Sequence, residues 1–215
     1  IQVQSDGGLI MAFVSNGTTI LDAGAFSASL GSMTLIKTIT LSSAAGTVSF
    51  VHGASDVVLD STYPVYKFTY TSVHPAEEGA IFQVGFRDGS SSYDATKTTT
   101  IFEPIANEGD TSAEIAYQPA QDLAQSTNFQ TLLRNNGNAN DECGSGEMLL
   151  FNPSSTTFVK HFLARGCGHH QSNYTYTDYV AGYCNVTAAI DAVQFKFHSD
   201  NIDAGTFKLY GIKDS

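Results

Sequence analysis

Four residues with side-chain oxygen atoms stand at alternate positions of one polar segment: Asn136, Asn138, Asn140 and Glu142. Carbonyl and carboxylate oxygens are the ligands that Ca²⁺ takes in proteins, so this spacing is compatible with a calcium loop. The segment 134–142 has far fewer carboxylates than an EF-hand loop, however. We therefore favour a polar loop without a bound ion, and we expect the four residues to belong to a contact surface.

A second group of reactive side chains consists of Cys143, Cys167, Cys184, His169 and His170. Thiolates and imidazoles bind zinc, but the paired Cys-x-x-Cys spacing of structural zinc sites is missing. Three cysteines are an odd number and too few for a disulfide framework, so free thiols are the favoured interpretation. We predict no metal and no cofactor, and we add both histidines to the candidate contact surface.

The sequence lacks the motifs of common enzymes. It contains no Gly-x-Ser-x-Gly elbow, no phosphate-cradling glycine loop and no His-Glu-x-x-His helix. Glycoside hydrolysis needs only two carboxylates, and the 21 acidic residues leave such a pair open. We predict that the protein is not an enzyme, and we keep a polysaccharide-degrading enzyme as the remoter alternative.

Aromatic residues are numerous, with 14 Phe and 10 Tyr but no Trp. Tyr174, Tyr176 and Tyr179 lie close together, and exposed tyrosines can stack on sugar rings. In a strand Tyr174 and Tyr176 would share one face, which is also the pattern of a core or an interface. A carbohydrate-binding, receptor-binding module is therefore the alternative function that we carry.

The charge balance restricts the partners. Acidic residues outnumber basic ones 21 to 10, which gives a net charge of −11. Such a surface repels nucleic-acid phosphates and anionic membranes. No stretch approaches the roughly 20 consecutive apolar residues of a membrane helix. We expect neither nucleic acid nor a membrane among the partners.

The elements that must position all these residues are β-strands, because short segments repeatedly alternate or collect apolar and β-branched residues between turns. The expected strands are 33–41, 47–51, 63–73, 81–87, 96–102, 147–151, 157–164, 174–183, 193–198 and 206–213. This pattern predicts an all-β fold, an antiparallel β-sandwich that resembles a jelly roll. Residues 33–215 are expected to form that single domain and residues 1–32 an N-terminal arm or linker. At 119–125 we expect one or two helical turns.

The chain is expected to close with a hairpin of the strands 193–198 and 206–213, with Gly205 in the turn. The alternation places the following side chains inward: Phe195, Phe197, Phe207 and Leu209.

A second hairpin is expected between 147–151 and 157–164, with facing residue numbers that sum to about 309. Cys143 and Cys167 would then lie almost opposite each other, and a disulfide between them is a candidate. The same register would bring the loop 134–145 beside the loop 165–173. The candidate contact residues would therefore form one continuous surface.

Several segments together resemble a known group of proteins: 35–41, 60–66, 73–75, 88–93, 145–153, 158–162 and 201–213. The resemblance is to uncharacterised structural proteins of tailed, especially marine, bacteriophages, which are described as tail, fibre or capsid-associated. It runs from about residue 33 to the end and brings no catalytic residue with it. It implies a virion structural protein, a capsid decoration or a tail or fibre component, assembled in the host cytoplasm. The implied partners are further copies of the chain, with a trimer favoured, other virion proteins and, as a further candidate, a host surface glycan.

Overall fold

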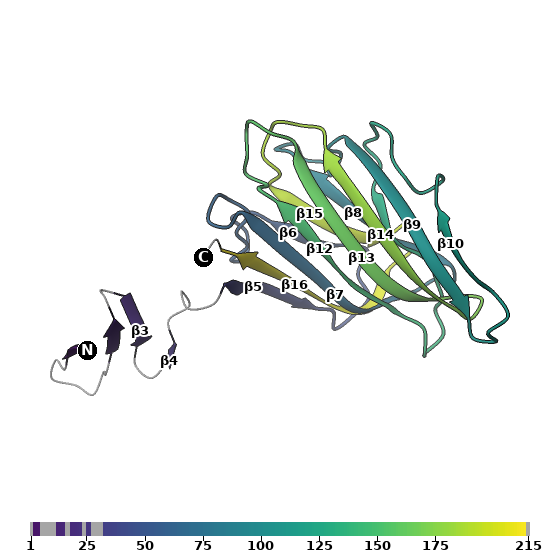
Figure 1. The fold of residues 1–215 in the computed structure, drawn as a ribbon, viewed down its shortest axis with the longest axis horizontal. Coiled ribbons are helices and arrows are strands. Elements are labelled where there is room, and N and C mark those ends of the chain that lie inside the picture. The colour runs from purple at the N-terminus through teal and green to yellow at the C-terminus, as the bar shows by residue number, and fades with distance from the viewer. Residues whose placement is uncertain (1, 5–11, 16–17, 23–24, 27–31, 214–215) are drawn as a thin grey trace.

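The computed structural model describes residues 2–4, 12–15, 18–22, 25–26 and 32–213, and the fold in these ranges is all-β (Figure 1). The helical turns expected at 119–125 are not formed, so that prediction is wrong. The segment bonds to its neighbouring strand instead: Gln118 N donates to Ile101 O at 3.0 Å, and Leu123 O accepts from Thr99 N at 2.9 Å. Between these two bonds the chain makes a single hydrogen-bonded turn, in which Gln121 N donates to Gln118 O at 3.0 Å, and no helix follows it.

Four short strands near the N-terminus form an antiparallel sheet of their own: β1 (Gln2–Gln4), β2 (Ala12–Ser15), β3 (Thr18–Asp22) and β4 (Ala25–Phe26). This small sheet lies apart from the main body in Figure 1. The described residues of the expected N-terminal arm or linker are therefore paired in short strands.

The main body contains twelve strands, and all their pairings are antiparallel. They are β5 (Met33–Thr40), β6 (Val48–Val51), β7 (Val65–Pro75), β8 (Ala80–Arg87), β9 (Lys97–Asn107), β10 (Ala113–Tyr117), β11 (Gln130–Asn136), β12 (Gly144–Phe151), β13 (Lys160–His170), β14 (Tyr174–Cys184), β15 (Ala192–Phe197) and β16 (Ile202–Ile212).

Eight of these strands pair in a nested order. β5 pairs with β16, β6 with β15, β7 with β12, and β8 with β11, so that outer strands enclose inner ones. Pairing of β16 with β7 and of β15 with β8 completes two sheets, β5-β16-β7-β12 and β6-β15-β8-β11. Nested pairing across two sheets is the arrangement of a jelly roll, which confirms the predicted fold class.

Two insertions widen the first sheet. β9 and β10 follow β8, β13 and β14 follow β12, and together they extend the sheet in the order β12-β13-β14-β9-β10. A wide sheet therefore covers a narrow one, with β13, β14 and β9 on the viewer's side of Figure 1. One residue pair, Asn136 with His170, joins β11 to β13 and links the two sheets at this side.

Aromatic side chains fill the space between the sheets. The ring of Phe195 lies within 6.4 Å, between centroids, of the rings of Phe50, Phe68, Tyr70, Phe82 and Phe207. The four side chains predicted to point inward, Phe195, Phe197, Phe207 and Leu209, are at most 2% exposed. That prediction is confirmed.

The expected closing hairpin is wrong. β15 pairs with β6 and β8 in the narrow sheet, whereas β16 pairs with β5 and β7 in the wide one. The segment 198–201 therefore crosses between the sheets. Gly205 lies within β16 at a register irregularity, where its φ of 151° suits glycine and an added Cβ would meet Phe207 Cε2 at 3.2 Å and Val73 Cα at 3.4 Å. Alternation identified the buried faces correctly but carries no information about which strands pair.

Candidate functional site

β12 and β13 form the predicted antiparallel hairpin in a different register. Leu149 faces Leu163 and Ser145 faces Cys167, so each β12 residue faces a position three residues further along β13 than expected. The cause is a longer connection. The hydroxyl of Ser155 accepts hydrogen bonds from the amides of Thr157 and Phe158, at 3.2 and 3.1 Å, and these residues therefore belong to the turn.

This register excludes the disulfide that we expected between Cys143 and Cys167. Cys167 faces Ser145, and the carbonyl of Cys143 accepts from the amide of His169 at 3.1 Å, so the two cysteines are diagonal neighbours. Diagonal Cα atoms are about 7–8 Å apart, beyond the usual reach of a disulfide. Cys143, Cys167 and Cys184 are all free.

The outward face of the wide sheet carries two unbroken cross-strand rows. The apolar row consists of Leu35, Tyr210, Lys67, Leu149, Leu163, Ala181 and Thr100. The mixed row, which runs beside it, consists of Lys208, Thr69, Glu147, Arg165, Tyr179, Phe102 and Tyr117. Residues that alternate with these along the central strands are buried, so the rows form the outer surface.

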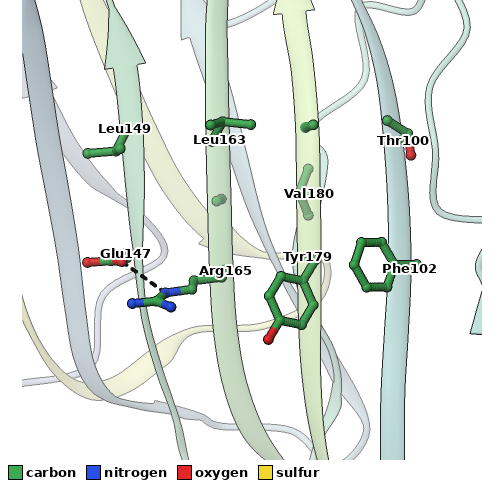
Figure 2. A pocket seen from close by; sticks show the side chains of 10 residues that line it. Thr100, Phe102, Glu147, Leu149, Leu163, Arg165, Tyr179 and Val180 are labelled. Atoms are coloured by element: carbon green, nitrogen blue, oxygen red, sulfur yellow. Dashed lines mark hydrogen bonds and ion pairs between the residues drawn. The ribbon is translucent and has the colours of Figure 1, made fainter. Parts of the chain in front are cut away.

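The mixed row has a charged half and an aromatic half (Figure 2). Glu147 pairs with Arg165 at 2.9 Å and with Lys67 at 2.5 Å. These two cations lower the pKa of the Glu147 carboxyl, Lys67 having the larger effect. On the next two strands the rings of Tyr179 and Phe102 stack with centroids 4.8 Å apart and planes 5° from parallel.

Large apolar side chains of this face are open to solvent. The exposed fractions are 49% for Leu163, 44% for Phe102, 38% for Tyr179 and 52% for Tyr117. Leu163, Tyr179 and Phe102 also line an open hollow of about 420 Å³ between the strands (Figure 2). Because the exposed apolar side chains are contiguous, the face has the character of a binding surface.

The charge of this face differs from that of the whole chain. Its two rows contain three basic residues, Lys67, Arg165 and Lys208, and one acidic residue, Glu147, although the chain has a net charge of −11. The two rows therefore carry a small positive excess, although the carboxylate of Asp122 accepts the hydroxyl of Tyr117 at their aromatic end.

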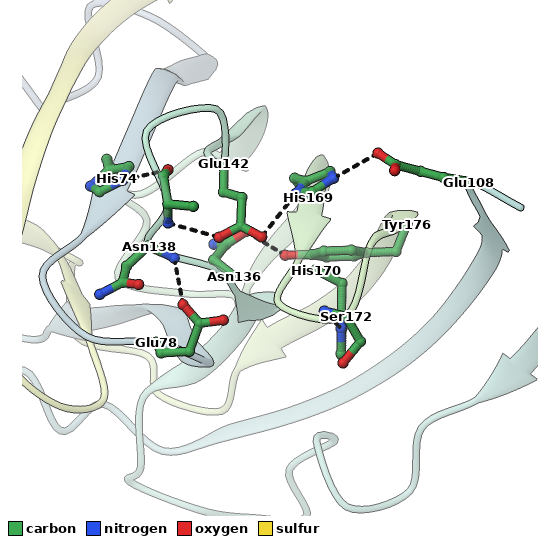
Figure 3. A network of polar contacts seen from close by, with 11 residues as sticks. His74, Glu78, Glu108, Asn136, Asn138, Glu142, His169, His170, Ser172 and Tyr176 are labelled. Atoms are coloured by element: carbon green, nitrogen blue, oxygen red, sulfur yellow. Dashed lines mark hydrogen bonds and ion pairs between the residues drawn. The ribbon is translucent and has the colours of Figure 1, made fainter.

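The two loops that we expected to meet do lie side by side at one end of the sandwich (Figure 3). The amide of Gly137 donates to the carbonyl of His169, and the amide of Gln171 donates to the carbonyl of Asn135, each at 3.1 Å. Asn138 and Asn140 are exposed, and His169 and His170 are half-buried. The two loops therefore meet as predicted, but the consecutive residues His169 and His170 point to opposite sides of β13: His169 lies against Glu142, and the ring of His170 lies against Tyr174 and Tyr176.

Glu142 closes the Asn-rich loop from inside. Its carboxylate accepts the amide of Ala139 at 2.8 Å and lies 3.2 Å from Nδ1 of His169. The other ring nitrogen of His169 lies 3.1 Å from Oε1 of Glu108. The two carboxylates, first Glu108 and then Glu142, raise the pKa of His169. The imidazole thus connects two acidic side chains (Figure 3).

Asn136 and Glu142 are buried, so the expectation that both contribute to the contact surface is corrected. Asn136 ends β11 and points into the core, where its Oδ1 accepts the hydroxyl of Tyr176 at 2.6 Å. Because the side chain of Asn136 points inward, it is separated from the exposed Asn138 and Asn140. The four oxygen-bearing residues considered as calcium ligands therefore do not surround a common ion position. Among the described residues there is no group of three or more His, Cys, Asp or Glu side chains placed to hold a metal ion.

Two carboxylates that the sequence analysis did not single out lie together in the core: Glu103 on β9 and Asp178 on β14, 1% and 0% exposed. Arg134 donates to both, from Nε to Glu103 at 3.1 Å and from its backbone amide to Asp178 at 3.0 Å. Burial, and after it the charge of Glu103, raises the pKa of Asp178 to about 8. In the sequence, this buried pair was indicated by an acidic residue at an inward-facing position of each of the two strands, β9 and β14.

A pair of carboxyl groups is what glycoside hydrolysis uses. Neither Glu103 nor Asp178 reaches the surface, however, so a polysaccharide has no access to this pair in the structure. The aromatic residues weighed as sugar platforms also divide: Tyr176 is buried, whereas Tyr179 is exposed on the opposite face of β14.

Comparisons with protein-family models, with curated proteins and with solved structures found no match to this chain. Within the described ranges no helix has the length and apolar character needed to cross a membrane.

Proposed function

We propose that this chain is a structural protein of a bacteriophage virion, a capsid decoration or a tail or fibre component, which works by binding other proteins. The observation that carries the binding role is the outward face of the wide sheet, where Leu163, Phe102, Tyr179 and Tyr117 are exposed together. Contiguous exposed apolar side chains mark interaction sites. The placement in a virion is supported by the sequence resemblance, and jelly rolls are a frequent architecture of viral capsid domains.

The proposed partners are further copies of the chain and other virion proteins. The two adjoining loops that carry Asn138, Asn140, His169 and His170 are a second proposed contact region, at the end of the sandwich. Residue types differ between the two surfaces, and we assign the sheet face to contacts that exclude water and the loops to polar contacts.

Quantitative mass spectrometry of purified particles tests this function. We expect the chain in the particles, with on the order of hundreds of copies for a capsid decoration and a few dozen or fewer for a tail or fibre. Absence from particles that contain the other structural proteins would overturn the proposal.

A carbohydrate-binding module is the second candidate function, and the exposed stack of Tyr179 on Phe102 favours it. Aromatic rings bind sugars through their apolar faces. A glycan array should then show binding that Tyr179→Ala abolishes and Phe158→Ala retains, because Phe158 is exposed but lies outside both rows. If the wild-type chain binds no glycan, this candidate is withdrawn.

A further inference from the structure

The mixed row changes character between two neighbouring strands. Up to β13 it contains Glu147 and Arg165, and from β14 onward it contains Tyr179, Phe102 and Tyr117. In the apolar row the large Leu163 stands on β13 and the small Ala181 faces it on β14. Each row therefore consists of two unlike halves that meet at the same boundary.

We propose that a second copy of this chain docks face to face on this surface, related by a two-fold axis. The axis lies in the interface, parallel to β13 and β14 and between them. This operation brings Arg165 over Tyr179 of the second copy and Leu163 over Ala181 of the second copy. The first contact is a cation over an aromatic ring, and the second places a large side chain over a small one. The inference deepens the proposed function and rests on it, because it names the partner of the exposed face.

Electrostatics favours an identical copy at this place. Two chains of net charge −11 repel each other, and the repulsion is weakest where acidic residues are scarce. In the six strands that overlap in this arrangement, the two rows contain Lys67 and Arg165 and one acidic residue, Glu147, which is already paired with both of them within its own chain. The charged half of each copy meets the aromatic half of the other, so like charges are not brought together.

The face is large enough for a stable contact. Neighbouring strands lie about 4.8 Å apart and successive residues about 3.3 Å apart. A part of the sheet that is six strands wide and about seven residues long therefore has a flat area of roughly 650 Å². Stable interfaces bury about 800 Å² on each partner. Side-chain relief adds accessible area to the flat estimate, so the field is of the required size.

The test is the mass of the full-length chain in solution, measured by sedimentation equilibrium over a micromolar concentration range. We expect two copies for the wild type. Leu163→Glu places a carboxylate where Ala181 of the second copy would cover it, and we expect at least about a tenfold weaker association. Phe158→Glu is the matched control, since Phe158 is 70% exposed outside the rows, and it should leave the dimer unchanged. Circular dichroism checks that both variants are folded.

Several results would overturn the inference. A monomeric wild type, a dimer that survives Leu163→Glu, or the three-fold assembly expected from the sequence would each exclude the two-fold contact. A monomer that binds a glycan through Tyr179 would assign the face to carbohydrate instead. The detection of the chain in virus particles does not depend on the mass that the purified chain has in solution. A monomer that is present in virions contradicts the inference alone, whereas a dimer that is absent from them contradicts the proposed function alone.

Discussion

Single residues show where this core departs from a purely apolar one. Lys97 and Lys160 are buried on either side of Cys184, and their ammonium groups bond to the backbone carbonyls of Ala95, at 2.6 Å, and Val186, at 2.9 Å. Burial lowers the pKa of both lysines. A buried charge is tolerated when it is hydrogen-bonded, so these lysines tie the ends of strands to the loops beside them.

Asp178 should make stability depend on pH. Its pKa is about 8 in the folded chain against an ordinary value of 3.8, so between these values the folded state holds one more proton than the unfolded state. The free energy of unfolding should therefore fall as pH rises from about 4 to about 8, by at most about 1.4 kcal/mol per pH unit. Asp178→Asn imitates the protonated acid and should remove this slope. Urea unfolding across the pH range measures it, and parallel profiles for both proteins would contradict the assignment.

His169 should respond to its exposed carboxylate partner. Glu108 is the larger cause of the raised pKa of His169, so Glu108→Gln should lower that pKa toward its ordinary value. A titration of the His169 ring followed by NMR measures the change. Glu114→Gln removes an exposed acid on β10 as the matched control and should leave the titration as it is. Equal titrations of all three proteins would show that the contact does not persist in solution.

At the scale of strands, glycines determine how closely the two sheets approach. Gly146 on β12 and Gly166 on β13 face each other, and a Cβ at Gly166 would meet Tyr70 Oη and Leu133 Cδ2 at 2.6 Å. Leu133 belongs to β11 of the narrow sheet. Because the two glycines have no side chain, β11 can come close to β13, where Asn136 pairs with His170.

Gly146→Ala should destabilise the fold. The added Cβ would lie 2.5 Å from the backbone carbonyl oxygen of Arg165, which cannot move without disturbing the hairpin. Overpacking of this kind costs about 1–3 kcal/mol. Gly46→Ala is the matched control, because its nearest neighbour, Asn201 Oδ1, is 3.6 Å away. Thermal unfolding compares the two, and an unchanged midpoint for Gly146→Ala would show that the strands can separate at no cost.

The sequence predicted the strands and their buried faces because alternation is a local property. Phe195 and Phe207 were assigned inward correctly on that basis. The pairing of β5 with β16 joins the two ends of the domain, and no local pattern contains such information. The β12 and β13 register failed for a local reason, since the Ser155 side chain lengthens the turn. Because the predicted register was three residues off, it also placed Cys143 opposite Cys167, whereas in the structure the two are diagonal neighbours.

At the scale of the whole molecule, the prediction of the site was limited in the same way. The loop surface with Asn138 and His169 followed from one hairpin, so its position was predictable within the sequence. The sheet face joins Leu35, Leu149, Leu163 and Phe102 from strands that lie far apart in the chain. It becomes visible only after the insertions are placed beside β12. The surface that carries the proposed function therefore depends on tertiary pairing.

The distribution of charge leads to a prediction about salt. Each chain has a net charge of −11, and the proposed dimer brings two such charges together through a face held mainly by apolar and aromatic contacts. The screening length falls from about 30 Å at 0.01 M to about 10 Å at 0.1 M ionic strength. Raising the salt concentration in this range should therefore tighten the dimer, which sedimentation velocity measures directly. Leu163→Glu should associate at least about tenfold more weakly than the wild type at both salt concentrations. A dimer that dissociates as salt is added would instead have to be held by ion pairs between the copies, and the apolar sheet face would not be its principal contact.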